Sequence, residues 1–410
     1  MEHCIPITKC LACGNADLEL TLDLQDQPLA NNFQKHAGVQ DTDLWFPLAI
    51  NRCTQCDHLQ LTHAVDPALI YTRYLYVSGT SGTYLEYMKW YASFVLETLT
   101  TYTDRMGPYS VLDIGCNDGS QLDAFKELLF RTYGVDPARN LFEASSKRHP
   151  IVCGFWNAEI ASRYTNSMDV VTTQNSFAHI PDPLAYLKLC KDCIKDDGKI
   201  FIQTSQADMV LNGEFDTIYH EHISYYNAES MKRLAERAGL YLIDVVKTPI
   251  HGTSYIFILS KKPANQARVE NILATESKLH MDSTYREWAT GVKDLLVRLK
   301  DQIDEYRHYG YAVVGYGAAA KGMTLINASD IHLDAVVDDN PLKQGLFCPG
   351  TAIPVVSSDY IKGFGDRDSI VFVPLAWNFY EEIVRKIRNI RNHKNDIFIK
   401  YFPVIKTECN

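Results

Sequence analysis

Apolar runs of strand length alternate with amphipathic stretches along much of this 410-residue chain. In the first half these runs fall at 110–114, 132–135, 169–173 and 198–204. Stretches with helical spacing of apolar residues lie at 82–102, 121–129, 184–194 and 268–307. A second series of apolar runs lies at 311–316, 335–339 and 369–374. Strands that alternate with helices form parallel sheets, so the pattern predicts an α/β protein with two Rossmann-like sheets.

The first predicted strand runs into a glycine-containing turn, Asp113-Ile-Gly115-Cys-Asn117-Asp-Gly119-Ser120. Glycines allow such a turn to fold tightly and to approach a ligand. Asp136 follows 21 residues after Gly115, at the end of the next predicted strand, where a carboxylate can accept both hydroxyls of a ribose. The turn lacks the middle glycine of G-x-G-x-x-G, and Asp118 would repel a diphosphate. It therefore fits S-adenosylmethionine better than a dinucleotide, and ordinary Rossmann-like packing is the alternative.

Two C-x2-C pairs lie near the N-terminus, at Cys10 and Cys13 and at Cys53 and Cys56. Four thiolates can form the closed tetrahedral set of a structural zinc site, which leaves no position open for a substrate. Reduced thiols without a metal are the alternative. The pair Cys190 and Cys193 repeats the spacing inside a predicted helix, so we interpret it as chance and expect small apolar groups.

The densest cluster of ionisable residues is Tyr219-His220-Glu221-His222. Its spacing is not the H-E-x-x-H of zinc proteases, and in an extended segment the two histidines would share one face. A His-Glu-His set can supply a general base, an orienting carboxylate and a hydrogen-bond donor, whereas a solvated polar loop is the alternative. Asn175 and His179 follow the third predicted strand, where ligands of parallel sheets bind. We expect both near the site, although His179 can also be an ordinary loop histidine.

The second predicted sheet opens with Gly315-Tyr316-Gly317-Ala-Ala-Ala320-Lys321, which leads into a helix. The spacing is that of the dinucleotide fingerprint, and free N–H groups at a helix N-terminus favour phosphate. Lys321 also suits a ligand that carries a diphosphate. The chain is therefore expected to have one nucleotide-type fold for a cofactor and another for a nucleotide attached to a substrate.

Composition and charge indicate to which broad class of protein the chain belongs. Hydrophobic residues make up 46% of the chain, which is ordinary for a globular protein. The formal net charge is -10 and no basic patch is visible, which argues against binding to nucleic acid. No apolar stretch reaches membrane-spanning length, and residues 1–9 lack the apolar core of a signal peptide. We therefore expect a cytoplasmic protein without a membrane partner.

These motifs together resemble the sugar C-methyltransferases that act on nucleotide-linked 4-keto-deoxysugars in bacterial surface-glycan and antibiotic-sugar pathways. The resemblance rests on the four cysteines and on the segments 28–33, 57–61, 113–120, 177–182, 219–225, 314–322, 343–345, 349–354 and 377–378. Ala376 departs from the proline that is common before Trp377-Asn378. The resemblance implies a zinc-binding domain over 1–67, an S-adenosylmethionine-binding methyltransferase domain over 68–260 and a Rossmann-like nucleotide-sugar-binding domain over 261–410.

The resemblance also implies C-methylation at C3 through an enolate, with S-adenosylmethionine as donor and a nucleotide-diphosphate 4-keto-deoxysugar as substrate. We expect His222 as the base and Glu221 to orient it, with Tyr76 and Tyr219 as donors to the keto oxygen and His220 behind them. The residues expected at the cofactor are Asp113, Gly115, Asn117, Gly119, Ser120, Asp136, Asn175 and His179. Those expected at the substrate are Ser78, Tyr316, Lys321 and Asn378. We expect a monomer or a weak homodimer.

Three other functions fit part of the pattern. An O- or N-methyltransferase would need only a base for a hydroxyl or an amine. A zinc-ribbon binding protein with a vestigial methyltransferase fold is disfavoured by the presence of Gly115, Gly119 and Asp136. An NAD-dependent epimerase would use the glycine-rich segment 315–320.

Overall fold

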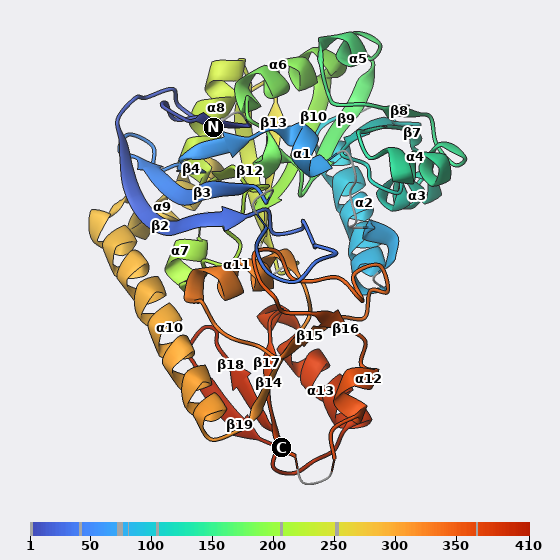
Figure 1. Cartoon of the computed structure of the whole chain (residues 1–410). Helices are drawn as coiled ribbons and strands as arrows, with labels where there is room; N and C mark the ends of the chain where they lie inside the picture. The colour runs from blue at the N-terminus through green and yellow to red at the C-terminus, as the bar shows by residue number, and fades with distance from the viewer. Residues whose placement is uncertain are drawn as a thin grey trace. The chain divides into compact units, whose positions relative to one another are not determined.

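The computed structural model describes residues 3–40, 43–71, 77–80, 82–103, 106–205, 208–250, 254–365 and 368–410. The chain forms two compact units, each assembled from several segments (Figure 1). Unit 1 comprises Met1–Glu19, Asn51–Ala207 and Glu221–His280. Unit 2 comprises Leu20–Ile50, Asp208–His220 and Met281–Asn410.

Unit 1 is built on a seven-stranded sheet of order β12-β13-β10-β9-β6-β7-β8. Its strands are β6 (Ser110–Ile114), β7 (Arg131–Asp136), β8 (Ile151–Cys153), β9 (Met168–Gln174), β10 (Ile194–Ser205), β12 (Tyr241–Thr248) and β13 (Ser254–Ser260). Neighbours pair in parallel except at β13, which is antiparallel to both β10 and β12. The sheet is therefore Rossmann-like with one reversed strand next to its edge, which confirms the predicted α/β core.

Helices cover both faces of this sheet, as its strand pattern requires. The helical segments of unit 1 are α1 (Pro67–Tyr71), η1 (Ser78–Thr80), α2 (Gly82–Tyr102), α3 (Ser120–Glu127), α4 (Arg139–Ser146), α5 (Ala158–Ser162), η2 (Phe177–His179), α6 (Pro183–Cys193), α8 (Ala228–Ala238), α9 (Gln266–Thr275) and η3 (Ser277–His280). Successive strand residues point to opposite faces. Val111 and Phe201 pack with α2 and α3, whereas Leu112 and Ile202 pack with α6 and α8. The strands are therefore buried on both sides.

The cysteine pairs lie in the N-terminal part of unit 1, in residues 3–19 and 51–65, here called the cysteine head. In this region β1 (Cys4–Pro6) pairs antiparallel with β5 (His63–Val65), and β4 (Leu59–Leu61) pairs antiparallel with β11 (Ser224–Tyr225). The strands β2 (Leu18–Pro28) and β3 (Trp45–Cys53) pass from one unit into the other. The short strand β11 places the segment after His222 directly against the cysteine head.

Unit 2 contains a six-stranded sheet of order β16-β15-β14-β17-β18-β19. Its strands are β14 (Ala312–Tyr316), β15 (Ala335–Val337), β16 (Val355–Val356), β17 (Ile370–Pro374), β18 (Ile397–Lys400) and β19 (Lys406–Cys409). All neighbours pair in parallel except β19, which is antiparallel to β18. Because β14 lies between β15 and β17, the winding reverses there, which is where such sheets bind ligands. The second predicted Rossmann-like sheet is therefore confirmed.

The helical segments of unit 2 are α7 (Met209–Asn212), α10 (Asp282–His308), α11 (Ala320–Ser329), α12 (Asp359–Lys362), η4 (Trp377–Phe379) and α13 (Tyr380–Ile390). The helix predicted over 82–102 matches α2, and the amphipathic stretch over 268–307 folds as α9, η3 and α10. Among the described residues, no helix has both the length and the apolar composition that crossing a bilayer requires.

Candidate functional site

The turn after β6 has a backbone geometry that glycine adopts most easily. Gly115 and Gly119 have φ angles of +84° and +82°. A Cβ atom on Gly115 would lie 2.7 Å from Ser176 Oγ and 3.0 Å from Ser176 Cβ. Glycine at position 115 therefore permits the left-handed backbone conformation and also the close approach of Ser176. The turn after β6 can thus pack against the turn after β9.

Two aspartates surround this glycine turn. Asp136 accepts the N–H of Asn117 on Oδ2 and the N–H of Ala138 on Oδ1, both at 2.8 Å. Burial raises the pKa of Asp136, and the two N–H donors oppose this shift. Asp113 is 3% exposed, and within the described part of the chain its Oδ1 has no hydrogen-bond partner. Burial, and then the charge of Asp136, raises the pKa of Asp113 to about 8. A buried carboxylate oxygen that lacks a donor beside this turn fits the cationic amino-acid end of S-adenosylmethionine.

The segment η1 lies on the glycine turn. The Ser78 N–H donates to Asn117 Oδ1 at 2.9 Å, and the Gly79 N–H donates to Asp118 Oδ2 at 3.1 Å. Asp118 Oδ2 also accepts the Ser120 hydroxyl at 2.9 Å. Ser78, which was expected at the substrate, thus contacts the predicted cofactor turn through its backbone. Tyr76 lies outside the described residues.

Asn175 and Gln203 form a polar pair at the ends of β9 and β10. The Asn175 N–H donates to the Gln203 carbonyl at 2.9 Å, and its side-chain amide donates to the Tyr84 hydroxyl oxygen at 3.1 Å. Gln203 is buried and accepts the Tyr87 hydroxyl on Oε1 at 2.8 Å. Sequence reasoning missed Gln203, Tyr84 and Tyr87. The available signal was the position of Gln203, a polar residue at the carboxyl end of a parallel strand.

Three aromatic rings stack where η2 ends. The ring centroids of Tyr71 and His179 are 5.5 Å apart, and those of His179 and His222 are 5.2 Å apart. Tyr225 meets His222 edge-on, with centroids 6.2 Å apart. His179 Nε2 is buried without a hydrogen-bond partner in the described residues, and burial lowers the pKa of His179 to about 4. A neutral imidazole therefore lies against the half-buried His222.

Backbone hydrogen bonds fix the loop that carries His222. The Ile223 N–H donates to the Ala178 carbonyl at 2.7 Å, and the Ile223 carbonyl accepts the Leu61 N–H at 2.8 Å. Glu221 is buried, and its carbonyl accepts the Tyr71 hydroxyl at 3.5 Å. Since Ser176 packs on Gly115 and His179 follows three residues later, His222 lies on the sheet edge that carries the glycine turn.

His220 and Tyr219 belong to unit 2. His220 is 2% exposed, its Nε2 lies 3.1 Å from the Phe46 carbonyl oxygen, and its ring meets the Phe46 ring edge-on. Burial lowers the pKa of His220 to about 4. These contacts give His220 a packing role within unit 2. Residues 219–221 form a bend and a turn, so the extended segment considered for the two histidines does not occur.

The four cysteines of the head converge on one point. Their Sγ atoms all lie within 4.8 Å of one another, with 3.6 Å between Cys10 and Cys56 and 3.5 Å between Cys13 and Cys53. A zinc–sulfur distance of about 2.3 Å gives tetrahedron edges of about 3.8 Å, so this set fits zinc. Four thiolates leave no open position, and zinc here would stabilise the fold. The other C-x2-C pair, Cys190 and Cys193, is buried in α6 as predicted.

The turn after β14 in unit 2 is built in a similar way. Gly317 has a φ angle of +93°, and the Ala318 N–H donates to Asp338 Oδ2 at 2.6 Å. The Tyr316 hydroxyl donates to Asp339 Oδ1 at 2.9 Å. The helix α11 begins just after this turn, and none of the described side chains caps its N-terminus. Its first N–H groups therefore favour an anion.

Lys321 lies in a cluster of aromatic and acidic side chains. Its Nζ is 5.0 Å from the centroid of the Trp377 ring and 4.0 Å from Asp216 Oδ1. Asp216 is buried, and its Oδ2 accepts the Trp377 indole N–H at 2.8 Å and the Tyr401 hydroxyl at 2.7 Å. Asn378 follows Trp377 in η4 and is half-buried. Sequence reasoning missed Asp216 and Tyr401, because neither lies in a motif.

The chain matches three family models in succession. Residues 10–71 match "Putative zinc binding domain", residues 84–245 match "Methyltransferase domain" and residues 249–403 match "C-methyltransferase C-terminal domain". The protein "C-methyltransferase NovU" of Streptomyces niveus is 29% identical over 393 residues, which is 92% of each chain. A "Ubiquinone biosynthesis O-methyltransferase" of Idiomarina loihiensis is 27% identical over 186 residues, which is 40% of this chain and 74% of that one.

Among solved structures, an S-adenosylmethionine-dependent methyltransferase from Clostridium acetobutylicum is similar at 13% identity and a TM-score of 0.35. It covers 43% of this chain and 92% of its own. The O-methyltransferase similarity covers less than half of this chain, whereas the similarity to NovU covers 92% of it. The four converging cysteines and the sheet with one reversed strand agree with the matched models. Along 92% of its length the chain is therefore similar to a C-methyltransferase, and it carries in succession regions that match a zinc-binding domain, a methyltransferase domain and a C-methyltransferase C-terminal domain.

Proposed function

We propose that this C-methyltransferase methylates C3 of a nucleotide-linked 4-keto-deoxysugar, for a branched sugar of a surface glycan or natural product. The observation that carries the proposal is the position of His222, stacked on the neutral His179 at the sheet edge that carries the glycine turn. Ligands of open α/β sheets bind at that edge. The similarity to NovU along nearly the whole chain supports the proposal.

The proposed reaction needs a base and a stabilised enolate, because a hydrogen next to a ketone is only weakly acidic. His222 would take the proton from C3, and Glu221 would orient the imidazole or share the proton path. Tyr76 and Tyr219 would donate hydrogen bonds to the keto oxygen as its charge develops. When bound, S-adenosylmethionine supplies an activated methyl group, which C3 takes while the sulfur keeps the pair of electrons from the broken S–C bond.

His179 suits this role for His222 through its own protonation state. Its pKa of about 4 keeps the ring neutral near pH 7. His179 then adds no positive charge beside His222 when His222 gains a proton, and like charges would raise the cost of that step. His220 would support the site only by packing.

The proposed cofactor site follows the glycine turn. Asp136 has lone pairs left after it accepts two N–H groups, so it would also accept the ribose hydroxyls. Asp113 would face the cationic end of the cofactor. The remaining lining residues proposed are Gly115, Asn117, Gly119, Ser120, Asn175 and His179.

The proposed nucleotide site lies in unit 2. The α11 N-terminus and Lys321 would hold the diphosphate, and Tyr316 and Asn378 would contact other parts of the substrate. Ser78 is proposed at the substrate but contacts the glycine turn through its N–H. The division into 1–67, 68–260 and 261–410, the cytoplasmic location and the monomer or weak homodimer stay predictions.

An assay of hydrogen–deuterium exchange at the carbon next to the ketone tests the proposal. The purified enzyme is incubated in D₂O with a panel of dTDP-, GDP- and CDP-linked 4-ketosugars and no methyl donor. Deuterium at the carbon next to the ketone, followed by a C-methyl product when S-adenosylmethionine is added, is the expected result. A methylated product from a substrate whose hydrogen next to the ketone does not exchange for deuterium would refute C-methylation and favour an O- or N-methyltransferase.

A further inference from the structure

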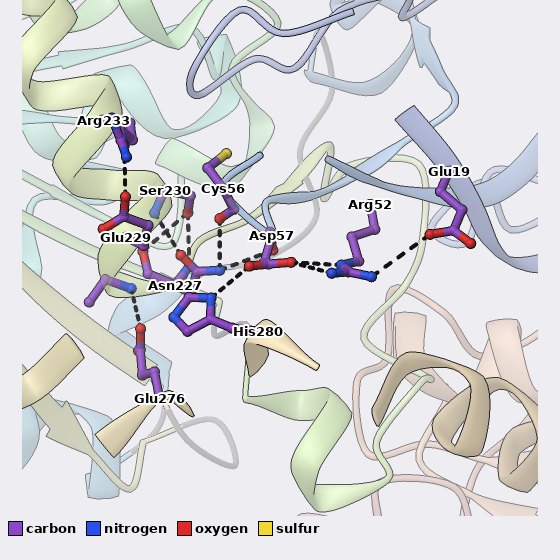
Figure 2. A network of polar contacts seen from close by, with 11 residues as sticks. Glu19, Arg52, Cys56, Asp57, Asn227, Glu229, Ser230, Arg233, Glu276 and His280 are labelled. Atoms are coloured by element: carbon purple, nitrogen blue, oxygen red, sulfur yellow. Dashed lines mark hydrogen bonds and ion pairs between the residues drawn. The ribbon is translucent and has the colours of Figure 1, made fainter. Parts of the chain in front are cut away.

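A network of polar side chains joins the cysteine head to the end of the His222 loop (Figure 2). At its centre lies Asn227, the residue before α8, which is fully buried. Its side-chain amide donates to the carbonyl oxygens of Cys56 and Asp57 at 3.3 and 3.0 Å. Its Oδ1 accepts the Ser230 N–H at 2.6 Å, and its own N–H donates to Ser230 Oγ at 3.0 Å. Asn227 therefore caps α8 and binds the second cysteine turn at the same time.

The side chain of Asp57 makes further contacts that stabilise the turn to which Asn227 is bonded. The Asp57 Oδ1 accepts Arg52 Nε at 2.7 Å and lies 2.6 Å from Arg52 Nη2, while Oδ2 lies 2.6 Å from His280 Nδ1 (Figure 2). The side chains of Arg52 and Asp57 are 6% and 9% exposed. Both Arg52 contacts go to the same carboxylate oxygen, and charge-assisted hydrogen bonds of this kind are stronger than neutral ones. The carbonyl groups that accept hydrogen bonds from Asn227 thus belong to a turn that the ion pairs of Asp57 stabilise.

The same turn reaches the His222 loop through backbone pairing. In the β4–β11 ladder Ser224 faces Gln60 and Tyr225 faces Leu59. His58, which is fully buried, places Nε2 3.2 Å from Ser224 Oγ. His222 therefore lies in a short loop, residues 221–227, here called the His222 loop. This loop is bonded to η2 through Ile223, and its last residue, Asn227, is bonded to the cysteine turn.

From these contacts we propose that Asn227 is a positioning residue, through which the Cys53–Cys56 turn sets the geometry of the His222 loop. The inference rests on the proposed role of His222 as the base. Metal binding by the four thiolates would hold the turn in one conformation. The two hydrogen bonds of Asn227 to the turn would then hold the end of the His222 loop in a fixed position. The head thus contributes to the rate of proton removal as well as to folding.

The test is Asn227→Asp. Aspartate keeps the acceptor that caps α8, but it places an oxygen where the amide donates to the Cys56 and Asp57 carbonyl groups. The matched control is Asn157→Asp, because exposed Asn157 caps α5 by accepting the Ile160 N–H at 3.0 Å and donates to the Phe155 carbonyl at 3.1 Å. The control makes the same chemical change at a second helix start, outside the cysteine head.

Three readouts separate positioning from general stability. For Asn227→Asp we expect a kcat at least tenfold lower, a dissociation constant for S-adenosylhomocysteine within twofold of the wild type, and unchanged zinc content. Amide hydrogen exchange over residues 221–226 should become at least tenfold faster while exchange over 111–136 stays the same. Asn157→Asp should match the wild type in every readout. Wild-type exchange over 221–226 in a folded, zinc-loaded Asn227→Asp protein would overturn the proposal.

A second measurement needs no variant, in case Asn227→Asp does not fold. Removal of zinc from the wild type by a chelator should speed exchange over 221–226 together with 51–61, with 111–136 unchanged. Protection of 221–226 that survives metal loss would also overturn the proposal. Hydrogen exchange does not depend on catalysis, so these results judge the coupling even if His222→Ala kinetics show that His222 is not the base.

Discussion

Replacement of Gly115 with alanine tests whether the turn after β6 holds the cofactor. Gly115 has a φ angle of +84°, and a left-handed conformation costs an L-residue about 1–2 kcal/mol. The new Cβ would also lie 2.7 Å from Ser176 Oγ and 3.0 Å from Ser176 Cβ. Rotation of the serine hydroxyl cannot relieve the second contact, so the turn after β9 has to move. The substitution therefore disturbs two turns at the same edge of the sheet.

The expected effect on cofactor affinity follows from this strain. In the free protein, the variant can relax the turn after β6 toward a conformation that alanine tolerates. Binding would then have to restore the original turn, at a cost of about 1–2 kcal/mol. That cost corresponds to roughly 5- to 30-fold weaker binding. The displaced Ser176 adds to this effect, so we expect the upper part of the range.

Calorimetric titration with S-adenosylhomocysteine, beside thermal unfolding, measures this effect against two control variants. Gly310→Ala introduces the left-handed strain alone, since Gly310 has a φ angle of +82° and no described atom outside its own chain neighbours lies within 4 Å of the added Cβ. Gly291→Ala in α10 introduces neither strain nor contact and should stabilise the helix by about 1 kcal/mol. Both controls should bind the ligand like the wild type. If Gly115→Ala lowers the unfolding temperature and keeps wild-type affinity, the cofactor lies elsewhere.

Four further results are expected. His222→Ala should abolish turnover and keep S-adenosylhomocysteine affinity, because the base contacts only the sugar; weaker binding in calorimetry would contradict this role. Asp136→Ala removes the acceptor of two turn N–H groups and should weaken binding at least about tenfold, whereas unchanged affinity would place the ribose elsewhere. Burial raises the pKa of Asp113 to about 8, so its carboxyl ionises as the pH rises through that value. Affinity for S-adenosylmethionine should therefore rise as Asp113 ionises up to about pH 8, above which the α-amino group of the ligand also loses its proton, and Asp113→Asn should flatten the increase. Chelation of zinc should unfold the cysteine head, detected by faster thiol modification, without loss of S-adenosylhomocysteine affinity; a head that stays folded would argue against a structural metal.

The elements around the cofactor turn could be predicted because each depends on a short window of sequence. The apolar run that forms β6, the left-handed glycines after it and Asp136 at the end of β7 follow from burial period and turn chemistry. The helix α2 was predicted over the same residues that the structure assigns to it. The convergence of the four cysteines also follows from a repeated local spacing.

The contacts of the histidine cluster could not be predicted from local patterns, because they join distant segments. His220 contacts the Phe46 carbonyl across 174 residues of sequence, and His58 contacts Ser224 across 166. His179 meets His222 because Ile223 bonds to Ala178 and because β11 pairs with β4. No periodicity specifies such pairings, so residue type suggested chemistry while tertiary packing decided which histidine lies at the sheet edge.

The way in which the His222 loop is held follows from the reaction proposed for it. A base acts on a carbon acid only within hydrogen-bond reach, and a displacement of about 1 Å can cost about a hundredfold in rate. The strand β11 has two residues at the edge of a four-stranded sheet, so its ladder with β4 holds only Ser224 and Tyr225. Asn227, with both amide donors on the turn after Cys53, gives the loop a further attachment beside those of Ile223 to Ala178 and Leu61. If it acts as proposed, the C-x2-C pairs and the histidine cluster, which are separate motifs in the sequence, serve the same proton transfer.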